Sequence, residues 1–418
     1  MTNEIVVNQT NILSEFNQPP VIIETVVSPD TYNKAAGILF ISSYPAQQNG
    51  VATYSRNLIS ALNTKFNDSF NISICRIVSD GERHASINSN GIKYILNTDQ
   101  PQSFTTLSAC INDDADISTV IIQHEFECFK KSESDFIQFL NTLVKPLVIV
   151  FHTVSSHPDE FLKKQVQHIY EVAESMIVMT NAEMEILINE YEVPRKKIIH
   201  IDHYTHFLKP PDKELLKIKY KLSGKKVFAT LGSLNWDRSI ETTLQALPAI
   251  ILENPDSMFL IIGKTNPSVM KEEGYKYRNM LDMMVRKLHL QNHVHYINYY
   301  LPFSELLEYL QLTDIYLFTS KDTEQAVSGI FYYALGNGCP IVSTPTPFAL
   351  EVLRNHIGII IDFNNSKQLE DAVNNLLKEE ETALKNHSKK LSKMEPGAFE
   401  NAAIAYAILF EKIGQDNS

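Results

Sequence analysis

The pair Ser328-Gly329 carries the most informative chemistry in this chain. It follows an apolar, strand-like run at Ile315–Ser320 and opens a helix-like segment that breaks at Gly336-Asn337-Gly338. A helix that begins in this way leaves backbone N–H groups at the positive end of its dipole, which suits a phosphate group. Glu324 stands just before the pair and offers a carboxylate to hydroxyl groups. The segment therefore predicts a receptor for a phosphorylated polyhydroxy compound.

Two more candidates follow strand-like runs in the first half of the chain. Gly50 ends a loop after the first strand, where a glycine lets the backbone approach a ligand and the next helix supplies N–H donors. A plain turn between a strand and a helix would need the same glycine. The loop lacks GxGxxG, which argues against a dinucleotide oxidoreductase. His152 ends the run Leu147–His152, and the carboxyl end of a parallel strand faces a ligand crevice. A structural histidine is the alternative there.

The elements that must position these residues are short apolar runs alternating with amphipathic segments. The β-branched and aromatic content of the runs predicts parallel sheets wound by crossover helices. Leucine and aromatic residues at fourfold spacing predict a helix with one buried stripe between the first two runs. The predicted strands are Ile38–Tyr44, Asn71–Ile77, Thr119–Gln123, Leu147–His152, Met176–Thr180, Lys197–Ile201, Val227–Ser233, Met258–Lys264, Val294–Tyr299, Ile315–Ser320, Pro340–Thr344 and Gly358–Asp362.

Bulk composition limits the class of protein. The chain has 418 residues, of which 44% are hydrophobic and 21% charged, as in ordinary globular proteins of two domains. A net charge of −12 argues against nucleic-acid binding. No apolar run is long enough for a transmembrane span, and the polar N-terminus does not read as a secretory signal. Four scattered cysteines without CxxC spacing favour a reduced, cytoplasmic setting, with contact at the inner face of a membrane left open.

The motifs together resemble the retaining glycosyltransferases of the GT-B fold, in the large family called family 4 or glycosyl transferases group 1. The stretch Thr323–Thr344 carries the likeness, which extends over roughly residues 37–413. It implies an α/β protein with two Rossmann-like, doubly wound parallel-sheet domains facing a central cleft. The form Glu-Gln-x-x-Ser-Gly at Glu324–Gly329 resembles a subgroup that lacks the usual pair of glutamates.

The resemblance and the composition divide the chain into five parts. The Pro-Pro pair and seven lysines of residues 207–226 have linker composition. Residues 1–34 are polar and read as an irregular arm. The family implies an acceptor-side domain at 35–206 and a nucleotide-sugar domain at 227–395. It also implies that a helix within 396–418 crosses back onto the first domain.

The resemblance assigns roles in the second half. Glu324 would contact the donor sugar, and Ser328 and Gly329 would face the phosphates, with Gln325 at the strict register position of the first family glutamate. Tyr333 stands where the family has its second glutamate, and it would lie near the nucleoside or belong to the core. Arg238 falls near the position where the family has a lysine that neutralises the leaving diphosphate, although a solvated cation at the start of a helix is the alternative.

The resemblance also assigns roles in the first half of the chain, and two positions depart from the family pattern. Gly50 would sit over the donor diphosphate and His152 would contact the donor sugar. His124 and Glu125 match a subgroup pattern on the acceptor side, although a capped strand end explains them equally well. Ser233 replaces an expected arginine, and Lys264 could compensate or could be a surface cation. Tyr204 is bulky where the family often has glycine.

The implied reaction moves a sugar from a nucleoside diphosphate, UDP- or GDP-linked, to an acceptor hydroxyl with retention of anomeric configuration. No DxD motif ends a suitable strand, so cationic side chains would replace a metal, and no cofactor is expected. Two other hypotheses remain. Ser233, Tyr333 and Tyr204 are compatible with a GT-B scaffold that has lost catalysis. A nucleotide-sugar epimerase or a sugar phosphorylase would use the same fold. The sequence does not indicate the acceptor or the oligomeric state.

Overall fold

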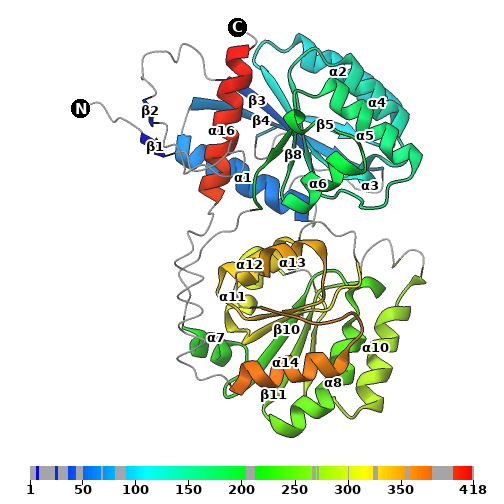
Figure 1. The fold of residues 1–418 in the computed structure, drawn as a ribbon, viewed down its shortest axis with the longest axis vertical. Coiled ribbons are helices and arrows are strands. Elements are labelled where there is room, and N and C mark those ends of the chain that lie inside the picture. The colour runs from blue at the N-terminus through cyan, green and yellow to red at the C-terminus, as the bar shows by residue number, and fades with distance from the viewer. Residues whose placement is uncertain are drawn as a thin grey trace.

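The computed structural model folds into two α/β lobes (Figure 1). It describes residues 6–8, 24–26, 36–43, 50–66, 69–80, 91–203, 212–265, 270, 273–299, 301–322, 328–353, 358–378 and 399–416. Every strand pair in the two large sheets is parallel. Parallel neighbours need crossover connections, which the helices supply. The predicted class, two parallel-sheet α/β domains, is confirmed.

The first domain contains a seven-stranded sheet in the order β5-β4-β3-β6-β7-β8-β9. Its strands are β3 (Ala36–Ser42), β4 (Phe70–Val78), β5 (Ile92–Asn97), β6 (Thr119–His124), β7 (Leu147–Phe151), β8 (Ser175–Val178) and β9 (Ile198–His200). Its helices are α1 (Gly50–Phe66), α2 (Pro101–Asp113), α3 (Phe126–Phe129), α4 (Glu133–Thr142), α5 (Glu160–Val172) and α6 (Asn181–Asn189).

The second domain contains a six-stranded sheet in the order β12-β11-β10-β13-β14-β15. Its strands are β10 (Lys226–Leu231), β11 (Ser257–Ile262), β12 (Val294–Ile297), β13 (Ile315–Phe318), β14 (Ile341–Ser343) and β15 (Gly358–Ile360). Its helices are α7 (Lys213–Lys219), α8 (Ile240–Glu253), α10 (Lys276–Lys287), α11 (Phe303–Leu312), α12 (Gly329–Gly336), α13 (Pro347–Leu353) and α14 (Ser366–Lys378).

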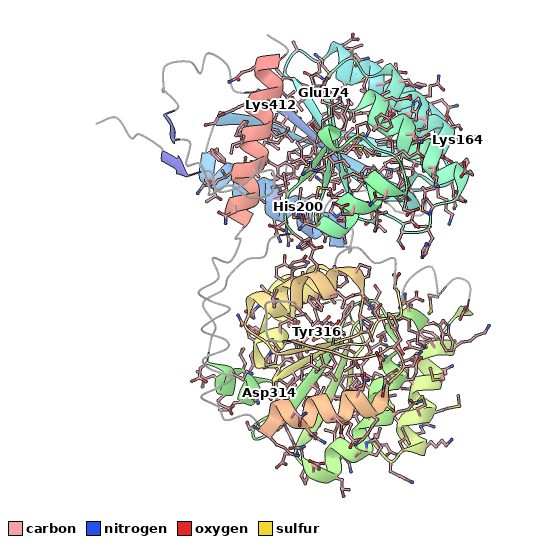
Figure 2. The ribbon with its side chains drawn as sticks, viewed as in Figure 1. Lys164, Glu174, His200, Asp314, Tyr316 and Lys412 are labelled. Atoms are coloured by element: carbon pink, nitrogen blue, oxygen red, sulfur yellow. The ribbon has the colours of Figure 1, made fainter. Side chains whose placement is uncertain are left out.

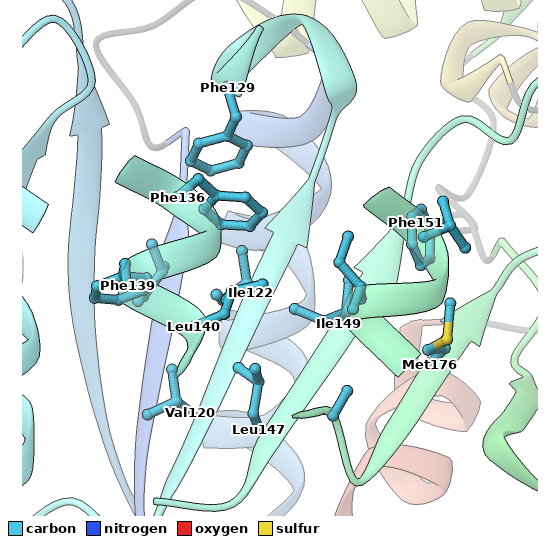
Figure 3. Packing of buried hydrophobic residues seen from close by; sticks show 14 of the residues in the cluster. Val120, Ile122, Phe129, Phe136, Phe139, Leu140, Leu147, Ile149, Phe151 and Met176 are labelled. Atoms are coloured by element: carbon cyan, nitrogen blue, oxygen red, sulfur yellow. The ribbon is translucent and has the colours of Figure 1, made fainter. Parts of the chain in front are cut away.

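The last helix of the chain, α16 (Phe399–Asp416), packs on the first domain beside α1 (Figure 1). Ala402, Tyr406 and Phe410 belong to the same buried cluster as Ile38 and Phe40 of β3. The chain therefore covers one face of the first sheet with its own C-terminus. The other face buries a second cluster, in which Phe129 stacks on Phe136 and Phe139 packs near Leu140 (Figure 3).

Three local features differ from the sequence prediction. Strand β5 is additional to the predicted strands. The residues expected to be an irregular arm include a short antiparallel pair, β1 (Val6–Asn8) with β2 (Glu24–Val26). The expected linker at 207–226 includes α7, whose Leu216 is buried in the second domain's core. Lys217 is also buried and ion-paired with Asp314, so this segment is anchored to the second domain, while Lys219, Lys221 and Lys226 remain exposed.

Candidate active site

Two glycines place the turns at the carboxyl ends of β10 and β11 in direct contact. Gly232 and Gly263 have φ angles of 128° and 138°, which L side chains rarely adopt. A Cβ on Gly263 would lie 1.9 Å from the carbonyl oxygen of Gly232, so only glycine fits. The Leu234 N–H donates to the Lys264 carbonyl at 2.8 Å, which locks the two turns together. This junction forms a rigid floor at the edge of the second sheet.

Arg238 lies over that floor. Its Nη2 atom is 2.9 Å from the point where a Cβ on Gly232 would stand, and its guanidinium lies 5.5 Å from the centre of the Phe318 ring. The carbonyls of Arg238 and Ser239 accept hydrogen bonds from the Thr319 hydroxyl at 2.9 and 3.2 Å. Within the described residues, no carboxylate pairs with this half-buried cation. The arrangement leaves Arg238 available for an anion.

The first turn of α12 lies beside the same floor, because Ile330 Cδ1 is 3.7 Å from the point that a Cβ on Gly232 would occupy. Ser328 is the N-cap of α12, and its buried hydroxyl accepts from the Phe331 N–H at 3.4 Å. Ser328 thus orients the helix and leaves Gly329 and Ile330 at its N-terminal end. Arg238 and a helix N-terminus therefore lie around one point, as a phosphate site requires.

An aromatic seam joins this helix to the first domain. The His203 ring stacks on Tyr332 of α12, with 4.8 Å between ring centres, and lies 3.8 Å from the position of a Cβ on Gly329. Tyr54 of α1 lies 5.3 Å from His203 and 5.2 Å from His152. The seam therefore links His152 of the first domain to the N-terminus of α12. Figure 2 places His200, at the end of β9, on the side of the first lobe that faces the second.

His152 follows β7 and is buried, with its Nε2 bonded to Gln123 Oε1 at 2.7 Å. Burial lowers the pKa of His152 to about 3, helped by the nearby rings of His203 and His124. The side chain is therefore neutral at physiological pH, and it can donate or accept a hydrogen bond but brings no charge. Gly50, the first residue of α1, is one turn from Tyr54 and its Cβ direction is open.

Two contacts cross directly between the domains. The Asn57 amide on α1 donates to the Tyr333 hydroxyl at 2.8 Å, and both residues are buried. The Glu351 carboxylate on α13 accepts from the backbone N–H groups of Asn181 and Ala182 at 3.0 and 3.1 Å, and from the Asn181 amide at 2.9 Å. Glu351 thereby caps α6 of the other domain, where a negative charge also complements the helix dipole.

The remaining predicted residues are dispersed. Lys264 is exposed at the end of β11. His124 is fully buried with neither ring nitrogen hydrogen-bonded, and burial lowers its pKa to about 3, which favours a packing role. The rings around it are Phe126, Phe129, Phe136 and Phe151. Glu125 is partly buried beside Thr153, and burial raises its pKa to about 7. Glu324, Gln325 and Tyr204 lie outside the described residues.

Sequence reasoning missed three residues that join the domains: Asn57, His203 and Glu351. His203 belongs to a stretch whose only sequence signal is its departure from the family pattern. The stripe on α1 predicted the buried face around Tyr54 but not the polar neighbour Asn57. No short motif marks Glu351, since its partner is the start of a helix about 170 residues away in the chain.

Comparisons with known proteins agree with this architecture. Residues 212–393 match the family described as Glycosyl transferases group 1. Spore coat protein SA of Bacillus subtilis strain 168 is 28% identical over 177 residues, which is 40% of this chain and 44% of that relative. The matched region therefore spans less than half of the curated relative.

Solved structures extend the likeness to both domains. Anabaena HepE in complex with UDP and glucose has a TM-score of 0.70 at 12% identity, covering 90% of this chain and 100% of HepE. A glycosyltransferase from Rickettsia africae has a TM-score of 0.70 at 17% identity, covering 91% and 99%. Sucrose-phosphate synthase from Thermosynechococcus elongatus has a TM-score of 0.69 at 14% identity, covering 91% of this chain and 100% of the synthase.

The chain thus has the GT-B fold, with two Rossmann-like lobes. Residues 212–393, a range that includes the described strands and helices of the second lobe, match the Glycosyl transferases group 1 family. Among the residues that the structure describes, no helix is long and apolar enough to cross a membrane, and no cluster of metal-ligating side chains occurs.

Proposed function

We propose that this protein is a retaining glycosyltransferase that moves a sugar from a nucleoside-diphosphate donor to an acceptor hydroxyl. The observation that carries the proposal is the convergence of Arg238, the N-terminus of α12 and the Gly232 turn inside the region that matches the Glycosyl transferases group 1 family. A helix terminus together with a guanidinium that no described carboxylate neutralises favours a diphosphate. We also place the chain in the subgroup with Glu-Gln-x-x-Ser-Gly at Glu324–Gly329.

UDP-glucose is the donor we propose first. HepE, whose fold covers 90% of this chain, was solved with UDP and glucose and with UDP-glucose itself. A diphosphate lying against Arg238 would place its sugar toward His152 along the seam formed by Tyr54 and His203. Gly329 would then contact the phosphates from the second domain, and Gly50 would approach them from the first.

The proposed roles divide the chemistry between orientation and charge. Arg238 and the α12 dipole would stabilise the departing diphosphate, while neutral His152 and Glu324 would orient the sugar. The departing phosphate would help to remove the proton from the acceptor hydroxyl on the same face. Lys264 is exposed and would approach the diphosphate only as a second, outer cation.

Donor binding and turnover test the proposal. Calorimetry should detect UDP and UDP-glucose binding, and release of UDP should require a sugar acceptor or water. Replacing Glu324 with Ala should abolish transfer while UDP still binds. His152→Gln should do the same with a smaller loss of stability than His152→Ala, because glutamine retains a hydrogen-bonding group beside Gln123. Full turnover by these variants would refute the assigned roles, and the absence of binding to UDP-, GDP- and ADP-sugars would refute the enzyme.

A binding or scaffold protein with this fold is the second candidate. The observation that favours it is the Tyr333 hydroxyl, which bonds to Asn57 across the domains at the position of the second family glutamate. If this contact replaces nucleoside binding, Tyr333→Glu should not improve donor affinity. An Asn57→Ala variant that gains donor affinity would instead show that the contact competes with the nucleoside.

A further inference from the structure

We infer that Arg76 binds an oxyanion, a phosphate or a carboxylate, carried by the acceptor. The inference rests on the proposed function, and it adds an acidic class of acceptor to it. Arg76 lies near the end of β4, its exposed fraction is 5%, and its Nε and Nη1 atoms are buried without a hydrogen-bond partner among the described residues. A buried charge without a partner is costly, so such groups are normally paired.

The described part of the chain supplies no counterion for this guanidinium. No carboxylate there forms an ion pair with Arg76, although acids lie close by in sequence. Asp80 accepts from the Asn97 and Gln100 amides at 2.7 and 3.1 Å, and Asp99 accepts from the Asp80 N–H at 2.9 Å. These carboxylates are exposed, and their hydrogen bonds go to Asn97, Gln100 and the Asp80 backbone rather than to Arg76. The side chain thus has two unused donors, Nε and Nη1, on a planar guanidinium that can bind an oxyanion.

Strand geometry places Arg76 on the same face of the sheet as the candidate sugar-contacting residue. Ile74 belongs to the cluster under α1 and α16, whereas Cys75 and Ile77 belong to the opposite cluster. Because side chains alternate along a strand, Arg76 lies on the α1 side. Val148 and Val150 occupy that same cluster, so His152 also lies on this side.

The strand register and strand order give the distance between Arg76 and His152 across the first sheet. Arg76 pairs with Ser42 of β3, and Ser42 bonds through its hydroxyl to Ser55 of α1 at 2.6 Å. The strand order runs β4-β3-β6-β7, so Arg76 is three strands from His152. Three spacings amount to about 14 Å. In the proposed binding mode, the acceptor spans this distance, with its hydroxyl toward His152 and its charged group at Arg76.

The Arg76 guanidinium belongs to the first domain, whereas Arg238 and Gly329, which we propose hold the donor phosphates, belong to the second. Arg76 lies in β4 of the first domain and Arg238 in the turn between β10 and α8 of the second, so the proposed anion site for the acceptor is separate from that for the donor. This separation gives specificity for an acidic acceptor without competition from the nucleotide. A neutral acceptor would leave the Arg76 charge without compensation.

A thermal-shift assay tests anion binding at Arg76 without requiring enzyme activity, because ligands that bind the folded state raise Tm. The probes are inorganic phosphate, glucose 6-phosphate, glucuronate and neutral glucose, at constant ionic strength. Wild-type protein should gain Tm with at least one sugar anion and not with glucose. Arg76→Met should lose that gain, whereas Lys164→Met should retain it. Lys164 is an exposed cation of the same domain, on α5 away from the second lobe (Figure 2).

Stability without ligand gives an independent readout. Arg76→Met removes a buried charge that lacks a counterion and retains an apolar stem, so its Tm in anion-poor buffer should equal or exceed that of wild type. Arg76→Lys should bind the sugar anion at least tenfold more weakly, because it has the charge without the fork. A lower Tm for Arg76→Met together with an unchanged response to anions would overturn the inference.

Two further measurements test whether the anion comes from a lipid or a soluble sugar, and whether the anion site is independent of donor binding. Flotation with phosphatidic acid vesicles tests a lipid-linked acceptor, and an Arg76-dependent association there would replace the soluble sugar anions as its source. Calorimetry with UDP should give the same Kd for wild type and Arg76→Met. An Arg76-dependent anion response without UDP binding would refute the proposed enzyme and retain the anion site. Normal UDP binding with an Arg76-independent response would refute the anion site alone.

Discussion

Replacing Arg238 with Met should weaken UDP binding about 10- to 100-fold. A hydrogen bond to a charged group contributes about 1.5–3 kcal/mol, and about 1.4 kcal/mol corresponds to a factor of ten in Kd. Arg238 is only half-buried, so solvent screening favours the lower part of this range. The substitution keeps the apolar stem beside Phe318 and Gly232, and therefore isolates the charge.

The same variant should remain folded. The Arg238 guanidinium stabilises the fold through its contact with the Phe318 ring, by about 0.5–1 kcal/mol. Loss of this contact corresponds to a decrease in Tm of at most about 4 °C. Calorimetry at two salt concentrations provides the assay, because removal of a cation should reduce the salt dependence of UDP binding. Arg238→Lys should fall between wild type and Arg238→Met. Arg286→Met, at an exposed position in the last turn of α10, provides a control of equal charge change.

UDP binding to Arg238→Met as tight as to wild type would refute a diphosphate site at Arg238. An equal loss of UDP affinity in Arg286→Met would refute it too, since a general change in net charge would then explain both results. A large loss of Tm in Arg238→Met would show that the guanidinium stabilises the fold, and the loss of binding would then say nothing about a diphosphate.

Other perturbations test the interdomain cap, the glycine floor and the buried titratable groups. Glu351→Ala should remove about 1–2 kcal/mol of interdomain hydrogen bonding, and small-angle scattering should show a larger radius of gyration. Gly263→Ala should lower Tm by about 6 °C or more, because its Cβ would meet the Gly232 carbonyl at a φ of 138°. Stability should fall as the pH drops below about 6.5, because the unfolded chain then binds protons that three buried histidines with lowered pKa values exclude: His124, His152 and His203. Burial raises the pKa of Glu125 and Glu183 to about 7, so their protonation stabilises the folded state as the pH falls from about 7 to about 4.5 and partly offsets the effect of the histidines. Below about pH 4.5 this offset no longer grows, so thermal melts should show a steeper loss of stability there.

The strands could be predicted because their signal is local. Runs such as Leu147–His152 are apolar throughout, as buried parallel strands must be, and all twelve predicted strands are present. Strand β5 was missed because its sequence, IKYILN, contains polar residues, and only part of it is buried. Helix α7 was hidden by its lysines, whose charges suggest a solvated linker until Lys217 is seen paired with Asp314.

The candidate site could be predicted only within each domain. Ser328 and Arg238 follow strand ends, and the rule that parallel strands point their carboxyl ends at a crevice applies to each sheet separately. Contacts between the sheets depend on how the lobes approach each other, and no local pattern encodes that approach. This is why Asn57 and Glu351 were missed. Arg76 was missed for a different reason, since a single arginine in an apolar strand has no motif, and only its burial without a described partner singles it out.

The neutrality of His152 has a consequence for how the proposed site must work. Burial holds its pKa near 3, so the first domain supplies no positive charge at this position to the departing diphosphate. In the proposed mechanism, that charge comes from Arg238, the α12 dipole and, further out, Lys264, all of which belong to the second domain. In that mechanism, sugar orientation and charge stabilisation would lie on opposite sides of the seam in which His203 stacks on Tyr332 and contacts Tyr54. Because catalysis needs both at once, the packing of this seam should control turnover, and substitutions there should change the rate of transfer even where donor affinity is unchanged.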